Sequence, residues 1–443
     1  MTDAAIAARW QFAFTIMFHY LFPILTMGLG VLIAVLKTIE LGTGQRIYGH
    51  AARFWARIFA ITFAAGVVTG IPMEFQFGTN WARFAKYAGP VVGQTLFMEG
   101  VFAFFAESSL LGVFLFAESR ISPRAHWLAA VGVAFGAVLS GYFIVATNAW
   151  MQHPVAYQPA GDHVELTSLW GLLSNPYVRW QYPHVISGAL VTGAMVMAGV
   201  GAFYLLARRD EESGRLFVRV GVVSGVLFSM LSLFPTGAFH GENITRFQPA
   251  KMATMEGLFK TQEGAPLAII GMPDRDRQEL MDPIYVPGVL SYLAYGNFSA
   301  TVTGLNDIPA DLHPPIEIVY YAYHIMVGLG TIFIAVMSAA AFLLWRGKLY
   351  THRGMLWALM LAMPFPYIAN EAGWVVAEVG RQPWVVYGLQ RVAHAASGNV
   401  TAGMTYFTLL GFMGLYLVLG VLYLLLFARI VMHGPGDSER VHA

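Results

Sequence analysis

Residues 371–384 read Glu-Ala-Gly-Trp-Val-Val-Ala-Glu-Val-Gly-Arg-Gln-Pro-Trp, and they decide how the surrounding chain must fold. The stretch begins inside an apolar segment, and its glycine and proline predict that a membrane helix ends at about Gly380. Glu378 therefore lies at a depth where a carboxylate is costly unless the protein uses it. With the donors Arg381 and Gln382 beside it, Glu378 predicts a cofactor or ion site. The alternative is a capped helix end that flanking tryptophans anchor at the membrane interface.

The composition of the whole chain is that of a membrane protein. Of its 443 residues, 57% are hydrophobic and only 12% are charged, whereas soluble proteins have about 25% charged residues. The absence of cysteine excludes disulfides, iron–sulfur clusters and thiolate-held metals. A redox metal would therefore need His, Met, Tyr or carboxylate ligands. The net charge of +1 gives no reason to expect a nucleic-acid partner, and no cleavable signal peptide is expected.

Nine apolar segments are long enough to cross a bilayer, which takes about 20 residues per helix. They predict an all-α integral membrane protein with about nine transmembrane helices. The segments are 10–36, 54–76, 92–118, 127–148, 183–207, 217–236, 317–345, 354–378 and 402–428. The one long connection, 237–316, has too many proline, glycine and charged residues to span, so we expect either an ordered extramembrane lobe or a flexible flap there.

The basic residues predict the orientation of these helices. With nine spans the two ends of the chain face opposite sides of the membrane. The side of the C-terminus receives the larger share of the 26 Lys and Arg residues, mostly in short connections. The positive-inside rule therefore predicts a cytoplasmic C-terminus, with the N-terminus and the long connection outside.

The third predicted span carries two carboxylates, Glu99 and Glu107. They are eight residues apart, which corresponds to about 12 Å along an α-helix and about 80° around it. Two such groups predict steps of a proton relay, although hydrogen bonds to neighbouring helices would also explain them. For Ser140 and Asn148, in the fourth span, a relay and a plain interhelical hydrogen bond are equally good explanations.

Four potential metal ligands fall toward the outer side of the predicted membrane. His19 is a single histidine in the first span, which more often is a core residue with hydrogen-bond partners than a ligand. His184 opens the fifth span and Met326 lies in the seventh, and a His–Met pair is a known haem ligand set. Together with Glu378 they are a stronger indication of a metal site than any one residue alone.

The long connection contains Lys251 and Glu256 in the sequence Gln-Pro-Ala-Lys-Met-Ala-Thr-Met-Glu. A solvated loop helix would explain this pair. A lipid-soluble substrate with two polar oxygens would instead need an acid and a base of this kind at the membrane interface.

These residues resemble subunit I of the cytochrome bd-type quinol oxidases, in the branch with a short quinol loop that includes cyanide-insensitive oxidases. The resemblance covers nearly the whole chain. Its most specific parts are Gly-Trp-Val-Val-Ala-Glu-Val-Gly-Arg-Gln-Pro-Trp (373–384), Glu-Gly-Val-Phe-Ala-Phe-Phe-Ala-Glu-Ser (99–108), Asn-Ala-Trp-Met-Gln-His-Pro-Val (148–155) and Gln-Pro-Ala-Lys-Met-Ala-Thr-Met-Glu (248–256).

The resemblance implies three haems and a role for each candidate residue. His184 and Met326 would ligate a low-spin haem b. His19 and Glu378 would ligate the two high-spin haems, which are a haem b and the oxygen-reducing haem d, or a third haem b in place of haem d. The resemblance does not indicate which of the two haems each residue ligates. The remaining implied roles are proton transfer for Glu99 and Glu107, quinol oxidation for Lys251 and Glu256, a position between haems for Trp374, and support of the haem site and its propionates for Arg381 and Gln382.

The activity implied by the resemblance is that of a terminal quinol oxidase in the bacterial cytoplasmic (inner) membrane. Quinol would be oxidised on the outer side at the loop 237–316, between membrane parts 1–236 and 317–443. O2 would be reduced to water with cytoplasmic protons, which generates a proton motive force without pumping. The expected partners are subunit II in a heterodimer, membrane lipid and, in some members, a small single-helix subunit.

Two functions from other classes remain as alternatives. A membrane ion transporter would use Glu99 and Glu107 as ion sites but leaves His184 and Met326 unexplained. A dihaem quinone-linked electron-transfer anchor usually pairs His with His. A haem–copper oxidase is disfavoured, because the chain has no adjacent His-His pair. The sequence leaves open ubiquinol or menaquinol, haem d or haem b, the oligomeric state and cyanide sensitivity.

Overall fold

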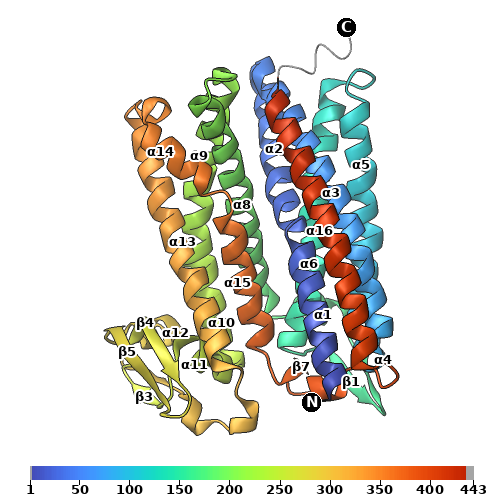
Figure 1. Cartoon of the computed structure of the whole chain (residues 1–443), viewed down its shortest axis with the longest axis vertical. Helices are drawn as coiled ribbons and strands as arrows, with labels where there is room; N and C mark the ends of the chain where they lie inside the picture. Colours follow the sequence, from blue (N-terminus) through green and yellow to red (C-terminus); the bar gives the residue numbers. More distant parts are fainter. Residues whose placement is uncertain (1, 436–443) are drawn as a thin grey trace.

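The computed structural model describes residues 2–435, which form a bundle of long helices standing side by side (Figure 1). Within these residues, eight helical runs are long and apolar enough to cross a membrane. They are Asp3–Thr43, Arg46–Thr79, Ala82–Phe116, Pro123–Gln152, Val178–Leu206, Glu211–Phe247, Ile316–Trp345 and Ala402–His433. The predicted fold class, an all-α membrane protein, is confirmed by this architecture and by the structural match given below.

Several runs consist of consecutive helices. The bounds are α1 (Asp3–Tyr20), α2 (Pro23–Thr43), α3 (Arg46–Thr79), α4 (Ala82–Met98), η1 (Glu99–Phe104), α5 (Phe105–Phe116), α6 (Pro123–Gln152), α7 (Leu169–Leu173), α8 (Val178–Leu206), α9 (Glu211–Leu231), η2 (Ser232–Gly237), α10 (Ala238–Phe247), α11 (Pro249–Glu256), α12 (Val289–Tyr295), α13 (Ile316–Trp345), α14 (Arg353–Leu361), α15 (Phe365–Val379) and α16 (Ala402–His433). Short 3₁₀ turns lie at Leu305–Asp307, Ala310–Leu312, Leu349–Thr351 and Val392–His394.

The ninth predicted span, 354–378, is present as two shorter helices. α14 ends at Leu361 and α15 begins at Phe365. Pro364 and Pro366 explain the break, because proline lacks a backbone donor and disfavours helical geometry in the residue before it. Neither piece alone is long enough to count as a spanning helix.

Proline also shapes the first span. α1 ends at Tyr20, and α2 starts with Pro23 in its first turn. The helix is therefore interrupted after Tyr20, and His19 lies in the last turn of α1.

Two helical runs each contain a short π-helix: η1 (Glu99–Phe104) lies between α4 and α5, and η2 (Ser232–Gly237) lies between α9 and α10. Such turns are rare, and they occur often at functional sites. η2 accommodates Pro235 inside a continuous helical run. As a result the sixth span continues to Phe247, beyond its predicted end at residue 236.

The long connection folds into an ordered lobe at one end of the bundle (Figure 1). Its main element is the antiparallel hairpin of β4 (Leu267–Asp274) and β5 (Glu279–Val286). A smaller pair joins β3 (Gln262–Glu263) to β6 (Thr301–Val302). His324 of α13 ties the lobe to the membrane helices, since its Nε2 lies 3.0 Å from the carbonyl oxygen of Ala268.

Two more antiparallel pairs complete the connections. β1 (Tyr157–Ala160) pairs with β2 (His163–Leu166), and β7 (Trp384–Val386) pairs with β8 (Gln390–Arg391). The sequence did not predict these short strands. They are all outside the spanning helices, so they leave the fold class unchanged.

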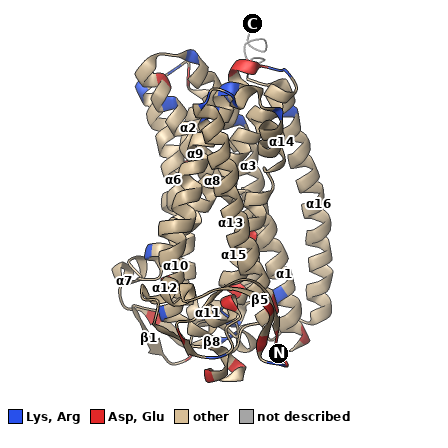
Figure 2. Cartoon of the chain, turned by 90° about the vertical axis from the view of Figure 1, so that its left-hand side faces the viewer, with Lys and Arg blue, Asp and Glu red and all other residues tan. Residues whose placement is uncertain are grey.

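Charge is distributed unequally between the two ends of the bundle. Lys and Arg gather at the end where α16 finishes, whereas the lobe and the N-terminus lie at the opposite end (Figures 1 and 2). The start of α1 and the end of α16 thus lie at opposite ends of the bundle. This is the arrangement from which the positive-inside rule predicts the lobe on the outer side.

Candidate functional site

α15 is the helix around which the candidate ligands are arranged. It packs against α13 through Gly373, where an added Cβ would lie 2.9 Å from Met326 Sδ. It packs against α8 through Asn370, whose side chain fills the space above Gly188. His184 lies one turn before Gly188 on α8. The predicted pair, His184 and Met326, therefore lies on two helices that both contact α15.

The π-helix η2 orients His184. The ring Nδ1 lies 3.1 Å from the carbonyl oxygen of Ser232, and the two rings of His184 and His240 are stacked with centroids 5.8 Å apart. A carbonyl can only accept, so Nδ1 carries the proton and donates it. Nε2 is then the basic nitrogen, as in histidines that bind metals through one nitrogen and are held by the other.

His19 is held in the same way. Its Nδ1 lies 3.1 Å from Thr69 Oγ1. That hydroxyl donates to the carbonyl oxygens of Ala65 and Gly66, so it accepts from the histidine. Gly70 provides the space, because a Cβ there would lie 3.1 Å from the His19 ring. Both histidines thus present Nε2 as the available ligand atom.

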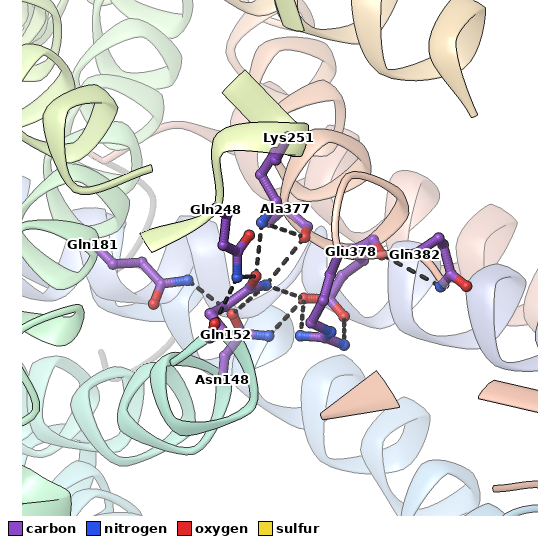
Figure 3. Close-up of polar contacts among 9 residues, drawn as sticks. Asn148, Gln152, Gln181, Gln248, Lys251, Ala377, Glu378 and Gln382 are labelled. Carbon is purple, nitrogen blue, oxygen red and sulfur yellow. Dashed lines mark hydrogen bonds and ion pairs between the residues drawn. The ribbon is translucent and has the colours of Figure 1, made fainter. Parts of the chain in front are cut away.

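Glu378 is the centre of a buried polar network, shown in Figure 3. Its Oε1 accepts hydrogen bonds from Asn148 Nδ2 at 2.6 Å, Gln152 Nε2 at 3.3 Å and Arg381 Nη1 at 3.3 Å, while Oε2 pairs with Arg381 Nη2. Arg381 is 4% exposed. The side chain of Glu378 is 39% exposed. The carboxylate is therefore paired with a buried arginine, while the Glu378 side chain remains partly accessible.

Gln382 completes the turn after α15. Its amide donates at 3.5 Å to the backbone oxygen of Glu378, not to the carboxylate. The stretch predicted as a site is thus drawn together, with Glu378, Arg381 and Gln382 in contact. The interhelical hydrogen bond considered for Asn148 is present, since Asn148 of α6 donates to Glu378 of α15, whereas the contribution of Gln152 was not indicated by the sequence.

Lys251 reaches this network from the lobe. It lies in α11 and is 1% exposed, and its Nζ donates to Gln152 Oε1 at 2.7 Å and to the backbone oxygen of Ala377 at 3.1 Å. Burial, with a smaller contribution from Arg381, holds the pKa of Lys251 well below its ordinary value. The solvated loop helix considered as an alternative is wrong, because this part of the lobe is buried against α6 and α15.

Glu256 lies at the other end of α11 and faces a different neighbour. It is 4% exposed, and its Oε2 has no hydrogen-bond partner. Burial raises the pKa of Glu256 to about 7, against a smaller opposing effect of a hydrogen bond with Tyr323. A carboxyl that titrates near neutrality is suited to accept and release protons. Lys251 and Glu256 therefore offer two polar groups in separate directions.

Glu99 and Glu107 both face α6. Ser140 Oγ donates to Glu99 Oε1 at 2.7 Å. At Gly136, one turn earlier on α6, an added Cβ would lie 2.8 Å from Glu107 Cβ. Because Glu99 opens the π-helix η1, the α-helical rotation from which the offset of about 80° was predicted does not apply between the two residues.

Trp374 and Glu371 lie on α15 near the break after α1. The rings of Trp374 and Tyr20 meet edge to face with centroids 5.5 Å apart. Both carboxylate oxygens of Glu371 are buried without a hydrogen-bond partner. Glu371 is a candidate that the sequence reasoning missed, although it opens the stretch quoted first. A carboxylate seven residues before Glu378 on a membrane helix was the available signal.

The residues present fit haem groups. Two histidines offer Nε2 as a ligand atom. Met326 Sδ fits beside α15 because residue 373 is glycine and has no Cβ. Buried polar atoms without protein partners occur nearby, including Arg381 Nε, His240 Nδ1 and Tyr20 Oη. Buried polar groups normally have a partner, and haem propionates would supply acceptors for such donors.

Comparisons with known proteins agree with this chemistry. The family model of cytochrome bd terminal oxidase subunit I matches residues 7–435. Cytochrome bd ubiquinol oxidase subunit 1 of Bacillus subtilis is 37% identical, over 97% of this chain and 94% of that protein. Cytochrome bd-II ubiquinol oxidase subunit 1 of Escherichia coli is 31% identical, over 99% and 98%. The solved structure of bd oxidase from Geobacillus thermodenitrificans superposes with a TM-score of 0.91 and 30% identity, over 97% of this chain and 99% of that one.

Proposed function

We propose how this chain works from one premise: it belongs to the cytochrome bd terminal oxidase subunit I family, and it is a subunit of a quinol oxidase in a membrane. This membership sets aside the ion transporter and the electron-transfer anchor. The functions proposed for individual residues rest on the geometry of the site and on the family resemblance.

The haem ligands are His19, His184, Met326 and Glu378. His184 and Met326 hold a low-spin haem b, while His19 and Glu378 hold the two high-spin haems, one haem b and one haem d or third haem b. When bound, these groups supply one-electron transfer and the centre at which O2 is reduced. The protein contributes the orientation of the ligands: Ser232 and Thr69 fix the two histidine rings, and the ion pair with Arg381 holds the carboxylate of Glu378.

The lobe 237–316 binds quinol through α11. Lys251 donates a hydrogen bond to one quinol oxygen, and Glu256, with its pKa of about 7, accepts a proton from the other. Trp374, which packs on Tyr20, takes the position between haems, and Gln382 supports the haem site and its propionates. The lobe shares its end of the bundle with the N-terminus (Figure 1), so the quinol protons are released on the outer side.

The protons for water formation come from the opposite side through Glu107 and Glu99. Both residues contact the Gly136–Ser140 face of α6: Glu107 packs on Gly136, and Ser140 holds the carboxylate of Glu99 in place. Release outside and uptake inside generate a proton motive force without a pump. Subunit II is the partner that completes the oxidase. The complex lies in the bacterial inner membrane.

The observation that supports this function most directly is the network that joins Lys251 of the lobe to Glu378 at the end of α15. The test is a dithionite-reduced minus air-oxidised absorption spectrum of the purified complex, combined with oxygen uptake driven by quinol. We expect b-type bands and quinol-dependent oxygen consumption. A far-red band identifies haem d, and its absence identifies a third haem b. A purified active complex without haem would contradict the proposal.

A further inference from the structure

Gln152 occupies a junction between three segments that are far apart in the sequence. It is the last residue of α6 and is fully buried. Its neighbours are the start of α11 and the end of α15, as Figure 3 shows. No role was expected for it from the sequence, although it lies within the motif 148–155.

The two ends of the Gln152 amide face different partners. Oε1 accepts from Lys251 Nζ at 2.7 Å and from Gln248 Nε2 at 3.0 Å. Nε2 donates to the backbone oxygen of Ala377 at 3.0 Å and to Glu378 Oε1 at 3.3 Å. The acceptor end thus meets Lys251 Nζ of the lobe, and the donor end meets α15.

A side-chain amide satisfies both neighbours because it carries an acceptor and a donor on separate atoms. A carboxylate has no donor for Glu378, and an ammonium group has no acceptor for Lys251. The backbone oxygen of Gln152 adds to the junction by accepting from Gln248 Nε2 at 2.6 Å. The whole residue therefore fixes the start of α11 relative to the end of α15.

We propose that Gln152 is a positioning residue that holds Lys251 for quinol binding and Glu378 for haem binding with the two ends of one amide. The inference rests on the proposed function. It adds to that function a direct structural link between the quinol side and the haem side. Without this link Lys251 loses one of its two acceptors, and the carboxylate of Glu378 loses one of its donors.

The test uses two variants of the intact oxidase complex, each examined by quinol kinetics and by the reduced-minus-oxidised spectrum. Gln152→Leu removes both ends of the amide. We expect the KM for quinol to rise by about 10- to 100-fold, the value of a hydrogen bond to a buried charge, and the high-spin haem bands to shift. Gln152→Glu keeps an acceptor for Lys251 but places a second carboxylate beside Glu378. Its KM should stay within about threefold of wild type, a smaller change than the loss of one hydrogen bond to a charged group would cause. The haem bands should still shift.

Gln76→Leu is the matched control, because Gln76 is also a buried amide but its side chain bonds to Thr15 on α1. We expect a wild-type KM and spectrum from it. Three results would overturn this inference while leaving the proposed function intact. The first is a Gln152→Leu complex with wild-type KM and spectrum. The others are equal effects of Gln152→Leu and Gln76→Leu, and equal effects of the two Gln152 variants on KM. A wild-type complex without haem or quinol oxidation would overturn the proposed function as well.

Discussion

Replacing Gly373 with alanine tests the position of Met326 directly. The added Cβ would lie 2.9 Å from Met326 Sδ, whereas non-bonded heavy atoms prefer a separation of about 3.5–4.0 Å. The sulfur must therefore move by roughly 0.6–1.1 Å if α15 and α13 stay in place. Methionine is flexible, so we expect the sulfur to move and the helices to remain.

The energetic cost of this substitution is small compared with its effect on the cofactor. Overpacking a filled core costs about 1–3 kcal/mol, and alanine in place of a helical glycine returns up to about 1 kcal/mol. The complex should therefore still fold. A His–Met ligand pair raises the reduction potential of a haem, so displacement of the sulfur should lower the potential of the low-spin haem.

The assay is a redox titration of the low-spin haem, followed by its reduced-minus-oxidised spectrum, in the purified Gly373→Ala complex. Gly411→Ala in α16 is the control, because a Cβ at that position would meet nothing within 4 Å. We expect a lower potential or a lost low-spin band in the first variant and wild-type behaviour in the second. A Gly373→Ala complex with the wild-type potential and spectrum would refute the assignment of Met326 as a ligand that packs on α15.

Three further predictions concern the other groups. Met326→Leu should abolish the low-spin haem signal and leave the high-spin signals, as a spectrum would reveal; retention of the signal would exclude this ligand. Since Glu256 is neutral below its pKa of about 7 and must be ionised to accept a proton, quinol oxidation should fall as the pH drops through 7. Glu256→Gln should remove that limb of the pH–rate profile, and an unchanged limb would assign it to another group. Ser140→Ala removes the 2.7 Å hydrogen bond to Glu99 and should lower kcat by about tenfold without changing the KM for quinol; a changed KM with normal kcat would contradict a role in proton delivery.

The sequence was sufficient for the membrane architecture. Lipid offers no hydrogen-bond partners, so each span must satisfy its own backbone locally, and apolar length alone then reveals the helices. The first apolar run, for example, contains a proline, yet it remains one spanning run from Asp3 to Thr43. The same local logic identified Glu378, because an ionisable residue at that depth stands out against its apolar surroundings.

Local reasoning failed where the backbone departs from α-helical geometry. Prolines at 364 and 366 were visible in the sequence, but whether they kink a helix or divide it depends on the packing of α14 and α15 on different neighbours. The π-helix η1 gave no sequence signal. Because Glu99 lies in η1, an α-helical projection does not describe how Glu99 and Glu107 both come to contact α6.

The partners of the polar residues were decided only by the tertiary structure. Lys251 and Glu378 are 127 positions apart in the chain, and the residue that joins them, Gln152, comes from a third segment. The sequence determined that a lysine, a glutamine and a glutamate exist near the ends of apolar segments. It did not determine that they meet. A buried polar side chain can pair with any suitable hydrogen-bond donor or acceptor, and the packing of α6, α11 and α15 decides which partner lies within reach.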